Sequence, residues 1–336
     1  LSEGFIRAQE KVGYFVEAVE HRPVTCTQAP PKEQPPQRQY LLDLTGNGTE
    51  HFPFSVWSRL QREVMLDLGE QLLLPMPNRG VEDLRLAIAQ HLADFRGMQV
   101  DPGCILVGAG TDFLYNILIQ LLGREHIYSI EEPGYGKIRR IYDTAGAITE
   151  SAPMDENGVI PQSLGEKRVL HISPSHHFPT GIVTPMPRRL ALLKWAAATD
   201  SFIIEDDYDS EFRFAGVSLP ALKAMDESEQ VIYMNTFART LAPGLRLSFM
   251  VLPKALIGRY RAMHAACSVP GFEQETLRKF IAGGYLERHV ARMRVVYRGR
   301  LQLLERRAAE LVCMRFCMWA AKYLRRSLCR WRRVPA

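Results

Sequence analysis

Short apolar runs alternate with helical patterns through most of the chain. Val81, Leu84, Ile88, Leu92 and Phe95 lie three or four residues apart, and this spacing predicts a helix after Gly80. The apolar runs have the composition of buried strands and lie at residues 105–107, 127–130, 169–172, 202–204, 231–234 and 247–252. Strands and helices that alternate in this way predict an α/β domain with a largely parallel sheet.

The two ends of the chain differ from this middle part. Residues 1–20 hold two short β-rich runs around a polar turn, which predicts a hairpin. Residues 21–39 contain five prolines among polar residues, a composition typical of an extended linker. We therefore expect the α/β domain over residues 40–311, followed by an atypical tail at residues 312–336.

The charge of the chain is concentrated in that tail. The formal net charge is +5, but residues 312–336 carry seven positive charges and no acid, so the rest of the chain has a net charge of −2. A nearly neutral body gives no electrostatic case for nucleic-acid binding by the domain itself. We interpret the tail as a poorly ordered segment, with a shifted reading frame as one origin. A basic amphipathic helix that contacts a membrane or nucleic acid is the alternative.

The sequence lacks the features of membrane-spanning, secreted and zinc-binding proteins. The chain is 46% hydrophobic and 24% charged, as in an ordinary globular protein. It has no apolar run long enough to span a bilayer and no secretory signal at its first residue, so we expect a cytoplasmic protein without membrane contact. The six cysteines lack the paired spacing of a zinc site, and we expect reduced thiols and no metal.

An acidic segment follows the strand at 202–204. Asp206 and Tyr208 are two residues apart, so in an extended segment their side chains point to the same side. A carboxylate beside a phenol suits a heteroaromatic ring that is protonated on one nitrogen and hydrogen-bonded at a neighbouring oxygen. The alternative interpretation of this segment is a solvated acidic loop.

Two further strand ends carry features of a phosphate site. After the strand at 231–234 come small polar residues and then a Pro-Gly turn that bears Arg246, whose guanidinium suits a phosphate. The segment 107–112, Val-Gly-Ala-Gly-Thr-Asp, is a strand, a glycine-rich turn and a helix start, where backbone N–H groups favour an anion. Taken alone, this Gly-x-Gly turn is also an ordinary strand–helix connection.

Together these segments resemble the aminotransferase-like domain of the MocR/GabR-type bacterial transcription regulators. PSHHFPTG at 174–181 is similar to the family's PSHQFPTG, and EDDYDSEF at 205–212 matches its segment letter for letter. NTFARTLAPGLR at 235–246 is similar to GTFSKTLxPGLR, with the family's separation of 31 residues between Tyr208 and position 239. Glu132-Pro133-Gly134-Tyr135 is similar to its EDPGY. The resemblance covers residues 40 to 311, and the early hairpin resembles the wing of the family's GntR-type winged helix.

The resemblance implies a fold, a cofactor and partners. The fold is that of type I transferases dependent on pyridoxal 5'-phosphate (PLP): a mixed, mostly parallel seven-stranded sheet sandwiched by helices. A small C-terminal domain would be truncated here. The resemblance also implies a homodimer and an amino acid or amine as effector. DNA would be bound only through the winged-helix module, which we expect to be missing except for its wing.

The resemblance further implies roles for single residues. Asp206 would pair with the PLP ring nitrogen, and Tyr208 would donate to the phenolic oxygen of the ring. His176 or His177 would lie near that oxygen, and Tyr135 would stack on the ring. The residues implied for the phosphate are Gly110, Thr111, Thr236 and Arg246.

Position 239 departs from the family. Arg239 occupies the position of the lysine that forms a Schiff base with PLP. A guanidinium has a pKa above about 12 and supplies no neutral amine, so we expect no internal aldimine. Either PLP binds without a covalent link, or Arg239 pairs with Asp206 or its acidic neighbours and the cofactor is lost.

We therefore predict an effector-sensing and dimerising domain of a MocR/GabR-like regulator that is inactive as an aminotransferase. A working PLP-dependent class I/II aminotransferase and a degenerate copy without function are the alternatives.

Overall fold

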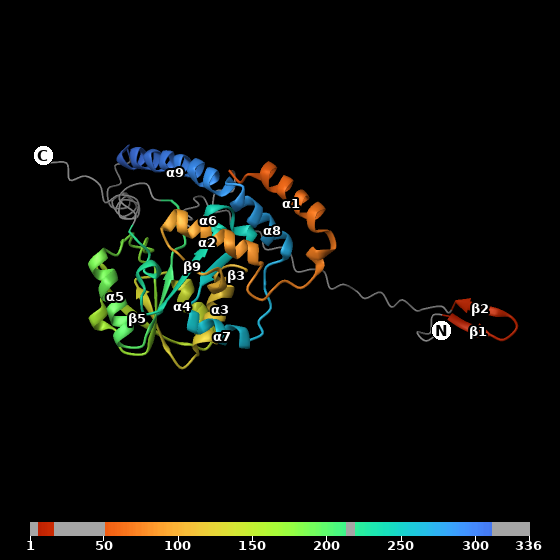
Figure 1. The fold of residues 1–336 in the computed structure, drawn as a ribbon, viewed down its shortest axis with the longest axis horizontal. Helices are drawn as coiled ribbons and strands as arrows, with labels where there is room; N and C mark the ends of the chain where they lie inside the picture. Colours follow the sequence, from red (N-terminus) through yellow and green to blue (C-terminus); the bar gives the residue numbers. More distant parts are fainter. Residues whose placement is uncertain (1–5, 17–50, 213–218, 311–336) are drawn as a thin grey trace. The chain divides into compact units, whose positions relative to one another are not determined.

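The computed structural model of the chain describes residues 6–16, 51–212 and 219–310 (Figure 1). The chain divides into two compact units, Leu1–Gly46 and Asn47–Ala336. The predicted linker at 21–39 and the predicted tail at 312–336 lie outside the described residues. The domain boundaries expected at residues 40 and 311 lie there too, and they stay predictions.

The first unit contains the predicted hairpin. Strands β1 (Ile6–Gln9) and β2 (Gly13–Val16) pair in antiparallel fashion, with Gln9 opposite Gly13. Lys11 and Gly13 adopt positive φ values of 61° and 132°, as a tight turn between two strands requires. The hairpin is confirmed as an element, whereas its assignment as a wing stays a prediction.

The second unit is built on one mixed sheet, in the order β3-β10-β9-β8-β7-β4-β5-β6. Its strands are β3 (Ile105–Gly108), β4 (Ile127–Glu132), β5 (Ile148–Asp155), β6 (Gly158–Val159), β7 (Arg168–Ile172), β8 (Phe202–Asp206), β9 (Val231–Thr236) and β10 (Ser248–Val251). Neighbours from β5 to β9 run parallel, whereas β10 is antiparallel to both its neighbours and β6 to β5. The mostly parallel mixed sheet is confirmed, with the two-residue β6 as an additional strand beside seven longer ones.

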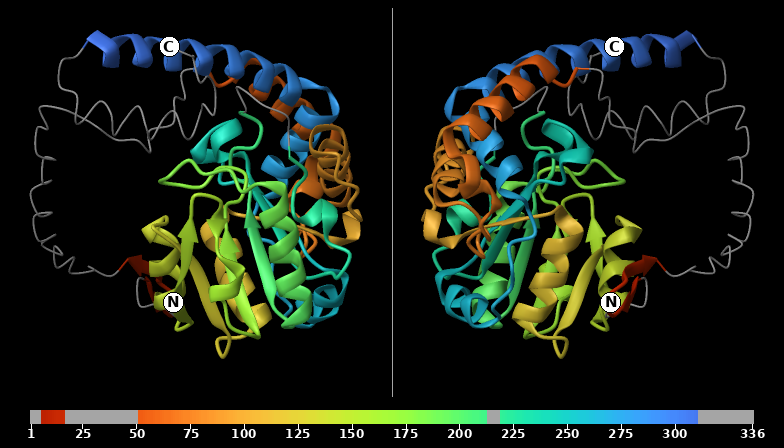
Figure 2. Two further views of the ribbon diagram at one scale, coloured as in Figure 1. Left: turned by 90° about the vertical axis from the view of Figure 1, so that its left-hand side faces the viewer. Right: turned by 90° about the vertical axis from the view of Figure 1, so that its right-hand side faces the viewer.

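Helices cover this sheet. They are α1 (Phe54–Leu68), α2 (Glu82–Arg96), α3 (Thr111–Leu122), α4 (Gly136–Thr144), α5 (Met186–Ala198), α6 (Phe237–Thr240), α7 (Lys254–Ala262), α8 (Gly271–Ala282) and α9 (Tyr285–Glu310). Helix α8 packs against α1, α2 and α9, and α9 and α1 lie along the top of the view in Figure 1 and of both views in Figure 2. Helix α3 packs against α4 and α7. No helix in the described ranges is long and apolar enough to cross a membrane.

The predicted helix after Gly80 is α2. Leu84, Ile88 and Leu92 are almost completely buried in the main core, as their spacing predicts. The helix ends where Gly97 adopts a left-handed conformation with φ 63°, a common helix C-terminus. A second core cluster lies between α5 and the β5–β7–β8 part of the sheet.

The sheet topology decides where a site can form. β4, β7, β8 and β9 are parallel, so their carboxyl ends meet at one edge of the sheet. The segments that begin at residues 133, 173, 207 and 237 therefore all leave the sheet on that edge.

Candidate cofactor site

Asp206 ends β8 and is buried, with 6% of its surface exposed. Its Oδ2 accepts a hydrogen bond from the Tyr115 hydroxyl at 2.5 Å, and His171 Nε2 lies 3.6 Å from the same oxygen. Its Oδ1 is buried and has no hydrogen-bond partner among the described residues. Since a buried carboxylate oxygen without a partner is costly, Oδ1 is suited to accept an N–H from a ligand.

Tyr208 lies in a turn that begins directly after Asp207. Strand β8 ends at Asp206 and the turn begins at Tyr208, so the two residues do not belong to one extended strand. The two side chains are nevertheless close enough to interact electrostatically. Burial raises the pKa of the Tyr208 phenol, the charges of Asp209 and Asp206 raise it further, and the charge of Arg239 lowers it. The charges of Asp206 and Arg239 therefore both act on the Tyr208 phenol.

His176 is tied to the same turn. Tyr208 donates its hydroxyl hydrogen to the backbone oxygen of His176 at 2.8 Å, and the two rings stack with centroids 6.2 Å apart. His176 Nδ1 lies 2.5 Å from Asp209 Oδ2. These hydrogen bonds and the ring contact therefore connect the loop after β7 to the turn after β8, next to Asp206.

The residues implied for a phosphate gather at the start of α3. Gly110 has φ 88°, and a Cβ built on it would lie 2.5 Å from Nη2 of Arg246. That guanidinium also donates to the backbone oxygen of Ala109 at 3.3 Å and lies 3.7 Å from the Asp112 carboxylate. Glycine thus lets a guanidinium approach the helix start at Thr111, where backbone N–H groups favour an anion.

Thr236 and Tyr135 lie on neighbouring segments. The Thr236 hydroxyl is buried, accepts from the backbone N–H of Ala238 at 3.2 Å, and is bonded to Ser248 Oγ at 2.8 Å. Ser248 pairs with Thr236 on one side and with Gly108 on the other, which places Thr236 at the same level of the sheet as the glycine turn. Tyr135 is 44% exposed, and its ring meets that of Phe178 edge-on at 5.8 Å.

Sequence reasoning did not assign roles to several charged residues around this site. Lys137 Nζ lies 2.7 Å from the Asp112 carboxylate. Glu131 accepts the backbone N–H of Ser173 at 2.9 Å, and the same carboxylate oxygen lies 3.5 Å from His177 Nε2. Burial raises the pKa of Glu131 to about 8 and, with the charge of His176, lowers the pKa of His177 to about 4. Near neutral pH both groups are therefore mainly uncharged.

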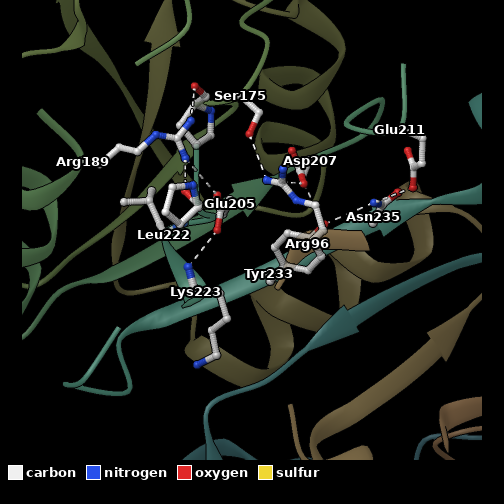
Figure 3. A network of polar contacts seen from close by, with 12 residues as sticks. Arg96, Ser175, Arg189, Glu205, Asp207, Glu211, Leu222, Lys223, Tyr233 and Asn235 are labelled. Atoms are coloured by element: carbon white, nitrogen blue, oxygen red, sulfur yellow. Dashed lines mark hydrogen bonds and ion pairs between the residues drawn. The ribbon is translucent and has the colours of Figure 1, made fainter. Parts of the chain in front are cut away.

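The other acids of the 205–212 segment belong to a buried network, which Figure 3 shows. Glu205 accepts the backbone N–H groups of Leu222 and Lys223 at 2.9 and 3.0 Å, and lies 3.7 Å from Arg189 Nη1.

Asp207 lies 3.0 Å from Arg96 Nη2 and accepts from the Tyr233 hydroxyl at 2.7 Å. In a strand, alternate residues point to opposite faces, so Asp206 points away from this network. Asp206, between them in sequence, has different contacts, with Tyr115 and His171.

Residues 42–314 match the profile of the aminotransferase class I and II family. The chain belongs to the aminotransferase class I and II family.

Several relatives of the chain are transcription regulators. It is 33% identical over 330 residues to the HTH-type transcriptional regulator YdeL of Bacillus subtilis (strain 168), covering 94% of this chain and 71% of YdeL. It is 37% identical over 251 residues to the rhizopine catabolism regulatory protein MocR of Rhizobium meliloti, covering 73% of this chain and 51% of MocR. These relatives confirm the resemblance to MocR-type regulators.

Solved aminotransferases confirm the fold. The kynurenine aminotransferase of Pyrococcus horikoshii, solved in complex with PMP, superposes with a TM-score of 0.69 at 25% identity, over 78% of this chain and 68% of that one. LysN, the α-aminoadipate aminotransferase of Thermus thermophilus, superposes with a TM-score of 0.68 at 25% identity, over 78% and 69% of the two chains. Family and fold together imply that the chain descends from PLP-dependent proteins.

Proposed function

We propose that this chain is the effector-sensing and dimerising domain of a MocR-type transcription regulator, and that it binds PLP without a covalent bond. The observation that carries the proposal is the unpaired Oδ1 of Asp206, buried at the carboxyl edge of the sheet. A protonated pyridine nitrogen is the kind of donor that this oxygen lacks.

The other residues fit the rest of the ligand. His176 would hold the phenolic oxygen of the ring, Tyr208 would do so once its hydroxyl turns from the backbone oxygen of His176, and Tyr135 would cover a ring face. The turn at Gly110, the start of α3 at Thr111 and the Arg246 guanidinium supply donors for a phosphate. Thr236 would add a hydroxyl beside them. When bound, PLP supplies an electron-withdrawing ring, which the carboxylate of Asp206 keeps protonated.

Arg239 sets the mode of binding. Its side chain lies close enough to Tyr208 for its charge to lower the pKa of that phenol. Because a guanidinium keeps its proton, it provides no nucleophile for the aldehyde of PLP. The domain would therefore hold PLP only through hydrogen bonds, ion pairs and ring contacts, and would exchange it with free PLP.

The test uses wild type and Arg239→Lys, titrated with PLP and followed by absorbance. We expect wild type to bind PLP and to lose it on dialysis. Arg239→Lys should show a new absorption band and retain the ligand, because lysine offers an amine that can become neutral. Arg261→Lys, on the exposed end of α7, is the matched control and should behave like wild type. Failure of wild type to bind PLP at all would overturn the proposal.

The regulatory role is tested with DNA. In this proposal, DNA contact belongs to a winged-helix module in which the β1–β2 hairpin is the wing, and the sensing domain responds to an amino acid or amine. A full-length regulator that carries this domain should shift its own promoter in a gel, and an amino acid or amine ligand should change that shift. Absence of promoter binding would contradict the regulatory role while leaving PLP binding intact.

A further inference from the structure

Three side chains outside the cofactor motifs form a chain of polar contacts that leads to Asp206 Oδ2. Tyr115 comes from α3, Tyr142 from α4 and His171 from β7, and all three are buried. Tyr115 donates to Asp206 Oδ2 at 2.5 Å, and the Tyr142 hydroxyl lies 2.7 Å from His171 Nδ1. His171 Nε2 then faces Asp206 Oδ2 at 3.6 Å. The four groups form one continuous polar chain inside an apolar core.

The protons of this chain follow from the surroundings. Burial raises the pKa values of both phenols, Tyr115 and Tyr142, well above their ordinary value. Both hydroxyls therefore keep their hydrogens and can act as donors. When Tyr142 donates to Nδ1, a neutral His171 carries its hydrogen on Nε2, which lies 3.6 Å from Asp206 Oδ2, beyond hydrogen-bond distance. Tyr115 is thus the hydrogen-bond donor to Asp206 Oδ2, and His171 is an electrostatic neighbour of the same oxygen.

The rings leave little room for another arrangement. The His171 ring meets the rings of Tyr115 and Tyr142 edge-on, with centroids 5.1 and 5.7 Å apart. Tyr128 packs behind Tyr142 at 4.9 Å. Rotation of the Asp206 carboxylate would break the hydrogen bond from Tyr115 to Oδ2. Oδ1 remains as the buried oxygen without a partner.

We propose that Tyr115 and His171, with Tyr142 behind them, are positioning residues that fix one oxygen of Asp206 and thereby direct the other at the ring nitrogen of the ligand. The proposal rests on the proposed function, since it assumes that PLP is the ligand. It assigns a selectivity to the site: a ring with a protonated nitrogen binds, and the same ring without that nitrogen binds more weakly.

The experiment compares PLP with 1-deaza-PLP, in which a carbon replaces the ring nitrogen. Dissociation constants are measured by equilibrium dialysis for wild type, Tyr115→Phe, Tyr142→Phe and the control Tyr128→Phe. Tyr128 is a suitable control because it is equally buried and packs on Tyr142, but its hydroxyl donates to the backbone oxygen of Gly123.

We expect wild type to prefer PLP over the deaza analogue. Tyr115→Phe should weaken PLP binding about tenfold, as loss of a hydrogen bond to a charged group does, and leave the deaza analogue nearly unchanged. Tyr142→Phe should give a smaller loss in the same direction, and it tests the proposal if Tyr115→Phe does not fold. Tyr128→Phe should change neither constant.

Two results would overturn the inference: equal affinity of wild type for the two ligands, or equal weakening of both ligands in Tyr115→Phe. The second result would show a merely structural role for this tyrosine. If wild type binds neither ligand, the proposed function itself fails, and that outcome is distinct from both.

Discussion

Glu131 and His177 form a buried, neutral pair, and their titration should be visible in the pH dependence of stability. The pKa of Glu131 is raised from 4.5 to about 8, and that of His177 is lowered from 6.5 to about 4. Between pH 4.5 and 8 the folded state therefore holds a proton on Glu131 that the unfolded state has lost. Between pH 4 and 6.5 the unfolded state holds a proton on His177 that the folded state lacks.

The two groups act with opposite signs. Stability falls with rising pH where the folded state binds more protons, and it rises where the unfolded state binds more, by about 1.4 kcal/mol per pH unit for one proton. As pH drops from 8 to 6.5, Glu131 alone should raise the free energy of unfolding by about 2 kcal/mol. From 6.5 to 4.5 the two contributions should nearly cancel. Below 4.5, acidification should destabilise the fold through His177.

The assay is urea unfolding of wild type, Glu131→Gln, His177→Gln and the double variant between pH 4 and 8. Relative to wild type, His177→Gln should gain about 3 kcal/mol in unfolding free energy between pH 6.5 and 4, because the variant no longer has the histidine that the unfolded state protonates. Glu131→Gln should remove the slope above pH 6.5, and the double variant should lack both effects. A constant difference between each single variant and wild type across the whole range would refute the reasoning.

Further predictions concern the buried network and the phosphate residues Gly110 and Arg246 at the start of α3. Arg96→Met leaves the Asp207 carboxylate buried without its cation and should lower the free energy of unfolding by about 3–5 kcal/mol in urea titrations; a loss below about 1 kcal/mol would contradict the assigned ion pair. Gly110→Ala places a methyl group against the Arg246 guanidinium and strains a residue with φ 88°, so PLP should bind about tenfold or more weakly by dialysis. Unchanged PLP affinity in Gly110→Ala would show that Gly110 and Arg246 do not hold the phosphate.

The sequence predicts helix α2 and most strands of the sheet, because these elements follow local apolar patterns. The spacing of Leu84, Ile88 and Leu92 predicts α2, and short apolar runs predict six strands of the sheet. Strand β5 (Ile148–Asp155) was not predicted, because most of its residues are at least partly exposed and its sequence has no apolar run.

The site is predicted only in part, because its arrangement depends on contacts between distant residues. The acids at 205–207 look equivalent in sequence. Glu205 and Asp207 differ from Asp206 because Arg189 and Arg96, far away in the chain, lie on their side of the strand. The residues that face Asp206 Oδ2, Tyr115 and His171, come from α3 and β7 and carry no local signal. The turn that begins at Tyr208 likewise depends on a distant contact, the hydrogen bond from its hydroxyl to the backbone oxygen of His176.

The most direct test of non-covalent PLP binding is the mass of the wild-type chain and of its peptides after incubation with PLP and reduction with borohydride. Dialysis in parallel should show reversible binding. After digestion we expect no phosphopyridoxyl group at position 239, since Arg239 supplies no amine that can capture the aldehyde, and we expect only the low, non-selective labelling of lysines that any protein shows. A mass increase of one phosphopyridoxyl group, mapped to any single residue of the site, would contradict this expectation.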